Sequence, residues 1–265
     1  MTNLAVIGVG VMGETVVAGL LRAGWDGESI VVADQNASRL DEVAERHGVV
    51  AAELDTAAAW ADAVVVVVKP QDAAAVWSQL AACVRPEAVV VSLCAGLTTS
   101  QIEKVLPAGT SVIRVMPNTP AQVGAGMAAI SAGSSATSDD VALVTELMSA
   151  LGRTVVVPEK HQDAVTAVSG SGPAYLFYVV EAMVDAGVLL GLARDVATEL
   201  AVQTVYGSAK LLAESGERPS VLRERVTSPA GTTAAALRKL EDRGVRAAFM
   251  EAMTAARDRS VELAN

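Results

Sequence analysis

The sequence predicts an α/β protein in which a doubly wound parallel sheet is followed by an all-helical domain. In the first part, short β-branched runs bounded by Gly, Pro or Asp alternate with helical patterns, which is typical of βαβ units. From Lys160 onward the apolar pattern is helical, and a glycine-rich turn follows the first strand-like run. We therefore expect two domains, residues 1–159 and 160–265.

Six apolar runs predict strands that are buried on both faces, because they do not alternate with polar residues. These runs are Leu4–Ile7, Ile30–Ala33, Val64–Val68, Ala88–Ser92, Ser111–Met116 and Thr154–Val157. In the second part, Tyr175–Leu192 is apolar nearly all round, so it needs cover on every side. A second subunit is the natural cover, and burial within one chain is the alternative.

Composition excludes several classes of protein. The 265 residues carry a net charge of −10 and only 3% aromatic residues, which argues against binding to nucleic acid or stacking on single-stranded bases. The histidines, His47 and His161, lack the spacing of metal ligands, so we expect no metal site.

The chain also reads as cytoplasmic and not membrane-bound. Its two cysteines, Cys83 and Cys94, form no CxxC motif, and no basic targeting segment opens the sequence. The apolar stretch Tyr175–Leu192 contains Glu181 and Asp185, which disfavour a membrane span. We expect a buried helix of a soluble protein.

A glycine-rich loop predicts dinucleotide binding. The residues Gly8-Val9-Gly10-Val11-Met12-Gly13 follow a predicted strand and open a predicted helix, as the G-x-G-x-x-G fingerprint of a Rossmann domain requires. The first glycine makes the turn, the second admits a pyrophosphate, and the third lets helix and strand pack closely. The amide groups at the helix N-terminus complete a phosphate site.

The identity of the nucleotide stays open between NAD(H) and NADP(H). Asp34, at the end of the second predicted strand, favours a free ribose 2′-hydroxyl and opposes a 2′-phosphate. Arg39 lies close by, although its place on a helix also allows it to point to solvent. Gln35, Asn36 and Ser38 could donate to a phosphate. We expect both cofactors to be used, with NADH unusually competitive.

Further cofactor contacts are expected where other strands end, because ligands bind at the carboxyl edge of such sheets. Lys69 could assist the cofactor or lie in solvent, and Asn118 could present its amide to the nicotinamide. The predicted cofactor residues are Ile7, Gly8, Val9, Gly10, Val11, Met12, Gly13, Asp34, Gln35, Val67, Val68, Lys69, Pro70, Cys94, Ala95, Gly96 and Asn118.

A second loop predicts a receptor for a carboxylate. The residues Ser228-Pro229-Ala230-Gly231-Thr232-Thr233 precede a predicted helix, so they offer hydroxyls and backbone N–H groups at a helix N-terminus. A plain capping role is the alternative.

The whole chain resembles the pyrroline-5-carboxylate reductase family. The resemblance rests on the N-terminal glycine loop, Val68-Lys69-Pro70, the run from Arg114 to Pro120, the run from Asp163 to Tyr175, Gly207-Ser208-Ala209-Lys210 and Ser228–Thr233. It implies a helical dimerisation domain, reduction of a cyclic imino acid to L-proline with NAD(P)H, and a homodimer or an oligomer of dimers. It further implies that Ser228, Gly231, Thr232 and Thr233 bind substrate, with the Thr233 hydroxyl near the ring nitrogen.

The sequence departs from the family pattern at three places. Ala230 stands where the family has a glycine, which tests whether this position needs a positive φ. Val11 replaces a common Asn in the glycine loop. Asp34 and Asp55 bring two acids to the region that surrounds the adenosine ribose in this family, which weakens the case for a strong NADPH preference.

Two other functions share part of this pattern. A β-hydroxyacid dehydrogenase of the 6-phosphogluconate type would carry a catalytic Lys where this sequence has Leu176. A redox sensor that binds a dinucleotide without turnover would not need the chemistry of the Ser228–Thr233 loop, which is largely intact.

Overall fold

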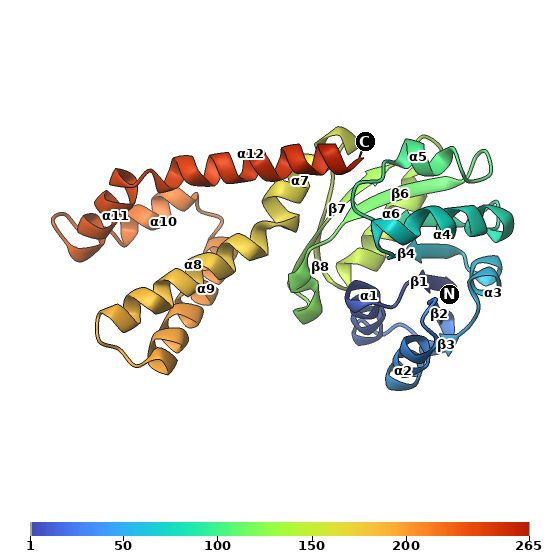
Figure 1. Ribbon diagram of the computed structural model, residues 1–265, viewed down its shortest axis with the longest axis horizontal. Coiled ribbons are helices and arrows are strands. Elements are labelled where there is room, and N and C mark those ends of the chain that lie inside the picture. Colours follow the sequence, from blue (N-terminus) through green and yellow to red (C-terminus); the bar gives the residue numbers. More distant parts are fainter. Residues whose placement is uncertain (1, 265) are drawn as a thin grey trace. The chain divides into compact units, whose positions relative to one another are not determined.

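The computed structural model describes residues 2–264, apart from the side chains of Pro70 and Ala264. Its central feature is one eight-stranded sheet of order β3-β2-β1-β4-β5-β6-β7-β8 (Figure 1). Every neighbouring pair is parallel except β6 and β7, so the predicted doubly wound α/β fold is confirmed. The strands are β1 Leu4–Ile7, β2 Ile30–Ala33, β3 Val50–Ala51, β4 Ala63–Val66, β5 Val89–Ser92, β6 Ser111–Met116, β7 Gly126–Ala132 and β8 Gly152–Val156.

Two of these strands were missed by the sequence analysis. β3 has only two residues, Val50 and Ala51, and β7 is built mainly of Gly, Ala and Ser, which are poor strand signals. β7 runs antiparallel because only the 3₁₀ turn η2, Thr119–Val123, lies in its connection from β6. A parallel crossover needs a dozen or more residues.

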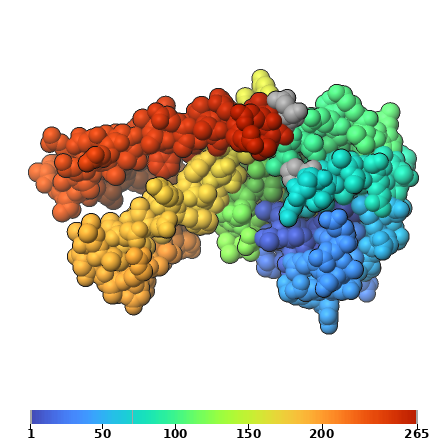
Figure 2. Space-filling model, in the orientation of Figure 1, coloured from blue at the N-terminus to red at the C-terminus, as the bar shows by residue number. Residues whose placement is uncertain are grey.

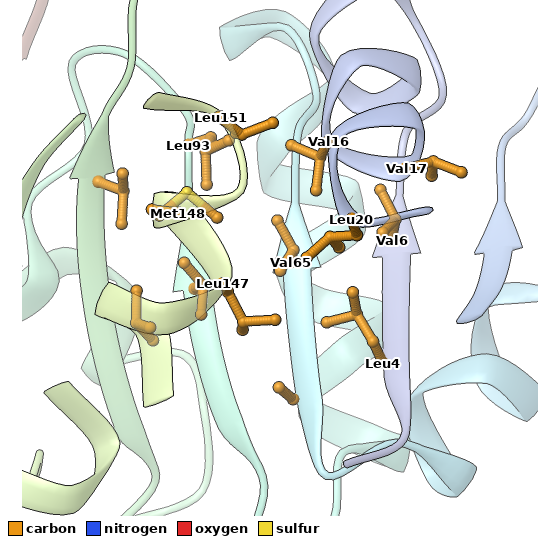
Figure 3. Packing of buried hydrophobic residues seen from close by; sticks show 14 of the residues in the cluster. Leu4, Val6, Val16, Val17, Leu20, Val65, Leu93, Leu147, Met148 and Leu151 are labelled. Carbon is orange, nitrogen blue, oxygen red and sulfur yellow. The ribbon is translucent and has the colours of Figure 1, made fainter. Parts of the chain in front are cut away.

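Helices cover both faces of the sheet. On one face, α1 (Val11–Arg22), α2 (Ala37–His47) and α6 (Ser138–Ser149) enclose a core that includes Leu4, Val6, Val65 and Leu147 (Figure 3). On the other face, α3 (Leu54–Trp60), α4 (Pro70–Cys83) and α5 (Thr99–Glu103) pack on Ala5, Ile7 and their neighbours. Alternate residues of β1 thus face opposite cores, as expected for a strand buried on both sides.

The contacts between residues divide the chain into two units. Unit 1 comprises residues 1–171 and 256–265, and unit 2 comprises residues 172–255. Unit 1 also contains the turns η1 Gly27–Ser29 and η3 Glu159–His161, the short helix α7 Gln162–Val165 and the π-helical turn η4 Thr166–Gly170. Within unit 1, the Ser260 hydroxyl donates to Asp163 at 2.7 Å, which fastens the chain's C-terminal turns. The boundary expected at residues 159 and 160 stays an interpretation of the sequence.

Unit 2 is helical, and it has a small core of its own. Only Val184, Ala197 and Ala201 form a buried apolar cluster, between α8 and α9. Figure 2 shows α8 in yellow with much of its flank at the surface, where Leu176, Phe177 and Tyr178 are each more than half exposed. The helices are α8 Gly172–Leu189, α9 Arg194–Ser215, α10 Pro219–Arg225, α11 Thr232–Asp242 and most of α12 Val245–Ala264.

One helical stretch, residues 159–189, is long and apolar enough to cross a membrane by length and composition alone. Helices of soluble proteins can share this length and composition. Most of α8 is exposed within the described residues, so the alternative that one chain buries this helix by itself is wrong, and its apolar surface needs cover from outside the chain.

Close packing at the glycine loop generates a prediction about stability. A Cβ atom at Gly13 would lie 1.9 Å from the Gly8 carbonyl oxygen, whereas a Cβ at Gly10 would meet nothing within 4 Å. Gly13→Ala should therefore lower the free energy of unfolding by about 3 kcal/mol, the upper end of the usual cost of overpacking. Gly10→Ala, the matched control, should cost less than about 1 kcal/mol. Urea denaturation measures both, and equal losses would contradict this packing.

Candidate functional site: a dinucleotide cleft and an anion loop

A cleft of about 570 Å³ opens at the carboxyl edge of the sheet in unit 1. It lies where the glycine loop, the end of β2, the residues after β3 and the end of β4 come together. Ligands bind at this edge in doubly wound folds. The cleft is lined by Ile7, Gly8, Gly10, Ala33, Asp34, Gln35, Ala52, Glu53, Leu54, Val67, Val68, Lys69, Gln71, Asp72, Ala75, Val76 and Gln79.

The glycine loop fits a bound pyrophosphate. Gly8 has a φ of +94°, and a Cβ there would lie 2.5 Å from the Val67 carbonyl oxygen, so only glycine fits this turn. Gly10 lines the cleft and has open space where a Cβ would be. A ligand can therefore approach the backbone closely at this point.

The N-terminus of α1 offers donors to the same ligand. Gly10 is the N-cap residue and provides no side-chain hydrogen bond. The amide groups of Val11, Met12 and Gly13 have no acceptor within the described residues, and the first later amide, that of Glu14, donates to Gly10 at 2.9 Å. Free amides at the positive end of a helix dipole bind phosphate well.

Asp34 holds the glycine loop from the neighbouring strand. One carboxylate oxygen accepts the Val9 amide at 2.7 Å, and the other accepts the Asn36 amide at 2.9 Å. Asp34 also lines the cleft, as expected for an acid that reads the ribose. Substituting it would therefore alter the loop as well as the ligand contact.

Arg39 is partly exposed, and its guanidinium is held by three acceptors. Its Nε donates to the Val9 carbonyl oxygen at 3.1 Å, and its Nη1 donates to Glu42 at 2.8 Å. Its Nη2 donates to Glu14, which also pairs with Arg46 at 2.6 Å. Arg39 therefore braces the glycine loop, and it neither points freely into solvent nor lines the cleft.

Glu14 is the centre of this network. Burial by itself raises the pKa of Glu14, but hydrogen bonds from His47, Arg46 and Arg39 outweigh that effect and lower its pKa to about 2. The carboxylate is therefore ionised at any physiological pH, and it neutralises the guanidinium next to the glycine loop.

The structure places part of the predicted cofactor set around the cleft. Those that line it are Ile7, Gly8, Gly10, Asp34, Gln35, Val67, Val68 and Lys69. Val9 is buried behind the loop, Val11 is exposed beside it, and Met12 and Gly13 pack on the core side of α1. The side chain of Pro70 lies outside the described residues; its place at the start of α4 is described.

The remaining predicted cofactor residues follow β5 and β6. Cys94 is buried, which raises the pKa of its thiol, while Ala95 and Gly96 are more accessible. Asn118 uses its amide within unit 1, since its oxygen accepts the Met127 amide at 2.8 Å and its nitrogen donates to the Ser169 hydroxyl at 3.2 Å. Their contact with a cofactor stays a prediction.

The anion loop, residues 228–233, lies in unit 2. Gly231 is the N-cap of α11, and its amide donates to the Ser228 carbonyl oxygen at 3.0 Å. The amides of Thr232, Thr233 and Ala234 have no acceptor within the part of the chain that the structure describes, nor do the hydroxyls of Ser228, Thr232 and Thr233 have a partner there. This loop therefore presents donors to an external anion.

The backbone of Ala230 shows that its position in the loop requires a positive φ. It has a φ of +59° and is the one non-glycine with a positive φ among the described residues. The loop thus keeps the left-handed backbone that glycine adopts easily, at a cost of roughly 1–2 kcal/mol for alanine. Replacing the family's glycine with Ala230 therefore changes the side chain but keeps the backbone conformation of the loop.

Sequence reasoning missed Glu53. Glu53 lines the cleft, whereas Asp55, the acid that the sequence suggests near the ribose, accepts a hydrogen bond from Gln79 at 2.7 Å and is not among the lining residues. The sequence did not reveal β3, because a two-residue strand shows no periodicity. Without that strand, Glu53 could not be placed at the carboxyl edge of the sheet. Within the described residues, no group of three or more His, Cys, Asp or Glu could hold a metal ion.

Comparison with known proteins covers the full chain. The family model for pyrroline-5-carboxylate reductase dimerisation matches residues 159–263, and the model for NADP oxidoreductase, coenzyme F420-dependent, matches residues 3–96. A pyrroline-5-carboxylate reductase of Corynebacterium melassecola is 43% identical over 267 residues, with 99% of each chain covered.

Solved structures agree with these matches. A pyrroline-5-carboxylate reductase from Coxiella burnetii superimposes with a TM-score of 0.94 at 36% identity, covering 100% of this chain and 99% of that one. A pyrroline carboxylate reductase from Plasmodium falciparum with NADP bound gives a TM-score of 0.89 at 27% identity, covering 100% and 98%.

The ion-pair network predicts a pH-dependent stability. Because the pKa of Glu14 falls from 4.5 to about 2 on folding, its contribution is complete above a pH of about 4.5 and is lost as the pH falls toward 2. Glu14→Gln should lower the Tm at neutral pH, and its difference from the wild type should shrink as the pH falls through that window. Circular dichroism melts measure this difference. Glu45→Gln, an exposed control on α2, should change the Tm little, and a pH-independent gap for Glu14→Gln would refute the assignment.

Proposed function

This chain belongs to the pyrroline-5-carboxylate reductase family, and we propose that it reduces 1-pyrroline-5-carboxylate to L-proline by hydride transfer from NAD(P)H. The observation that carries this proposal is the full-length relationship at 43% identity. The cofactor cleft and the anion loop support it, because each offers free backbone amides to a negatively charged ligand. The first serves the dinucleotide and the second serves the carboxylate of the substrate.

The cofactor is assigned to the cleft of unit 1. The open backbone at Gly10 and the free amides of α1 suit its pyrophosphate, and Asp34 suits the ribose. Lys69 adds a positive charge on the cleft wall. When bound, the cofactor supplies the hydride, so the protein needs to orient it and to exclude competing reactions.

The substrate carboxylate is assigned to the anion loop. The N-terminus of α11 offers the amides of Thr232 and Thr233 to an anion, and Ser228 adds a hydroxyl. Gly231 allows the turn to close tightly on Ser228. These residues are the proposed substrate contacts.

The reaction needs little acid–base catalysis by side chains. Hydride adds to the carbon of the C=N bond while the ring nitrogen takes a proton, which converts the cyclic imine to a secondary amine. A protonated imine is already electrophilic, so positioning supplies much of the catalysis. We assign Thr233 as the hydrogen-bond partner of the ring nitrogen, with water as the proton source.

The chain forms a dimer through its helical domain, as the dimerisation match over residues 159–263 indicates. The exposed apolar residues of α8 and α9, among them Phe177 and Leu200, supply surface for a second copy. Assembly of dimers into a larger oligomer, a cytoplasmic location and the absence of membrane contact are further parts of this proposal. A helix covered by a partner subunit needs no lipid to satisfy its apolar surface.

The activity is tested with Thr233→Ala. The wild type should oxidise NAD(P)H, seen as loss of absorbance, when pyrroline-5-carboxylate is added. The variant should lose about 1–3 kcal/mol of transition-state stabilisation, roughly 5- to 150-fold in kcat/KM, with little change in cofactor affinity. Thr233→Ser keeps a hydroxyl and should retain most activity. Dinucleotide binding without oxidation would favour the redox-sensor alternative, and full activity of Thr233→Ala would remove its assigned role.

The dimer is tested by analytical ultracentrifugation. The wild type should sediment with the mass of at least two chains. Phe177→Glu places a charge on exposed apolar surface of α8 and should shift the protein toward the single chain. Val123→Glu changes a still more exposed valine in unit 1 and should leave assembly intact. An active wild-type single chain would contradict the dimer.

A further inference from the structure

We propose that Glu53 makes the cofactor cleft select a dinucleotide with a free ribose 2′-hydroxyl over one with a 2′-phosphate. This inference rests on the proposed function, because it concerns how the same cleft distinguishes NADH from NADPH. Four features of unit 1 support it: the position of Glu53, its lack of a partner, the engagement of Arg39 and the distance of Lys69 along the sheet.

Glu53 lies opposite Asp34 at the carboxyl edge of the sheet. Parallel strands β2 and β3 pair Val31 with Val50 and Val32 with Ala51, and the Ala52 amide donates to Val32 at 3.0 Å. Continuing this register by two residues places Asp34 beside Glu53. Both residues line the cleft, at the strand end where doubly wound domains hold the adenosine ribose.

The Glu53 carboxylate is free to act on a ligand. Glu53 is exposed and is the N-cap residue of α3, but its side chain makes no cap hydrogen bond. It has no ion-pair partner among the described residues. Asp34, by contrast, uses both oxygens on the amides of Val9 and Asn36. Of the two carboxylates, that of Glu53 is therefore the one more available to interact with a ligand.

The nearby cation that could bind a 2′-phosphate is already engaged. Arg39 donates to the Val9 carbonyl oxygen, to Glu42 and to Glu14, and the low pKa of Glu14 keeps that partner ionised. Arg39 is not among the residues that line the cleft. Three of its five N–H donors are used and two carboxylates neutralise its charge, so a phosphate would gain little from this guanidinium.

The remaining charges of the cleft do not compensate for the acids. Lys69 follows β4, which is separated from β2 by β1, so it lies away from the ribose end. Asp72 on α4 adds a further negative charge to the lining. A 2′-phosphate would therefore meet Asp34 and Glu53, and among the described residues no guanidinium or ammonium group lines that end of the cleft, so like charges repel there.

The test measures the dissociation constants of NADH and NADPH by isothermal titration calorimetry on the full chain without substrate. The wild type should bind NADH more tightly. Glu53→Gln should tighten NADPH binding by about three- to tenfold and leave NADH within about twofold, and Glu53→Lys should move the ratio further in the same direction. The wild-type discrimination should weaken at high salt, because a partly exposed charge is screened.

Asp55→Asn is the matched control. It removes a negative charge two residues away, yet an asparagine oxygen can still accept the hydrogen bond from Gln79. It should change the NADPH to NADH ratio by less than about twofold. Thermal melts should show that all three variants fold.

The remaining outcomes would overturn either the role of Glu53 or the proposed function. A wild type that prefers NADPH, an unchanged ratio in both Glu53 variants, or an equal shift in Asp55→Asn would overturn the role of Glu53 while leaving the reductase proposal intact. A wild type that binds neither dinucleotide would overturn the proposed function itself.

Discussion

The two hydrogen bonds to the backbone of Val9 are the constraint on which the nucleotide site depends. Asp34 accepts the Val9 amide and Arg39 donates to the Val9 carbonyl oxygen, so the peptide groups on both sides of this residue are held by the next βα unit. The same loop is fixed on its other side by close approach of Gly8 to the end of β4. A loop held in this way presents the α1 amides without a conformational cost when a phosphate arrives.

This bracing shapes the electrostatics of the cleft. Asp34 and Arg39 both hold the loop, so the oxygens of Asp34 that face the ribose already accept two amides, and the charge of Arg39 is neutralised by Glu14 and Glu42. The ionised Glu14 maintains the bracing and removes the positive field of Arg39 from the ligand. Glu53, whose side chain makes no cap hydrogen bond, adds a second acid to Asp34 at this end of the cleft.

The helical unit, in contrast, buries few apolar side chains within one chain. Its internal core consists of three small or β-branched residues, while large apolar side chains on α8 and α9 remain exposed. Such a unit gains its burial by association, which agrees with the dimerisation match. Its anion loop nevertheless has a defined backbone within one chain, since even Ala230 adopts the left-handed conformation required there.

The sequence by itself determined the βαβ alternation of the first part, the helical second part and the position of the glycine loop. Short apolar runs such as Leu4–Ile7 and the glycine spacing carry strong local signals, because burial on both faces and close backbone approach each restrict residue type. Tertiary structure alone decided what lacked such a signal. The alanine-rich β7 became a strand through its neighbours β6 and β8, and the two-residue β3 brought Glu53 in place of Asp55 to the cleft. The direction of Arg39 was likewise set by Glu14, 25 residues away, because side-chain pairing across elements leaves no trace in local periodicity.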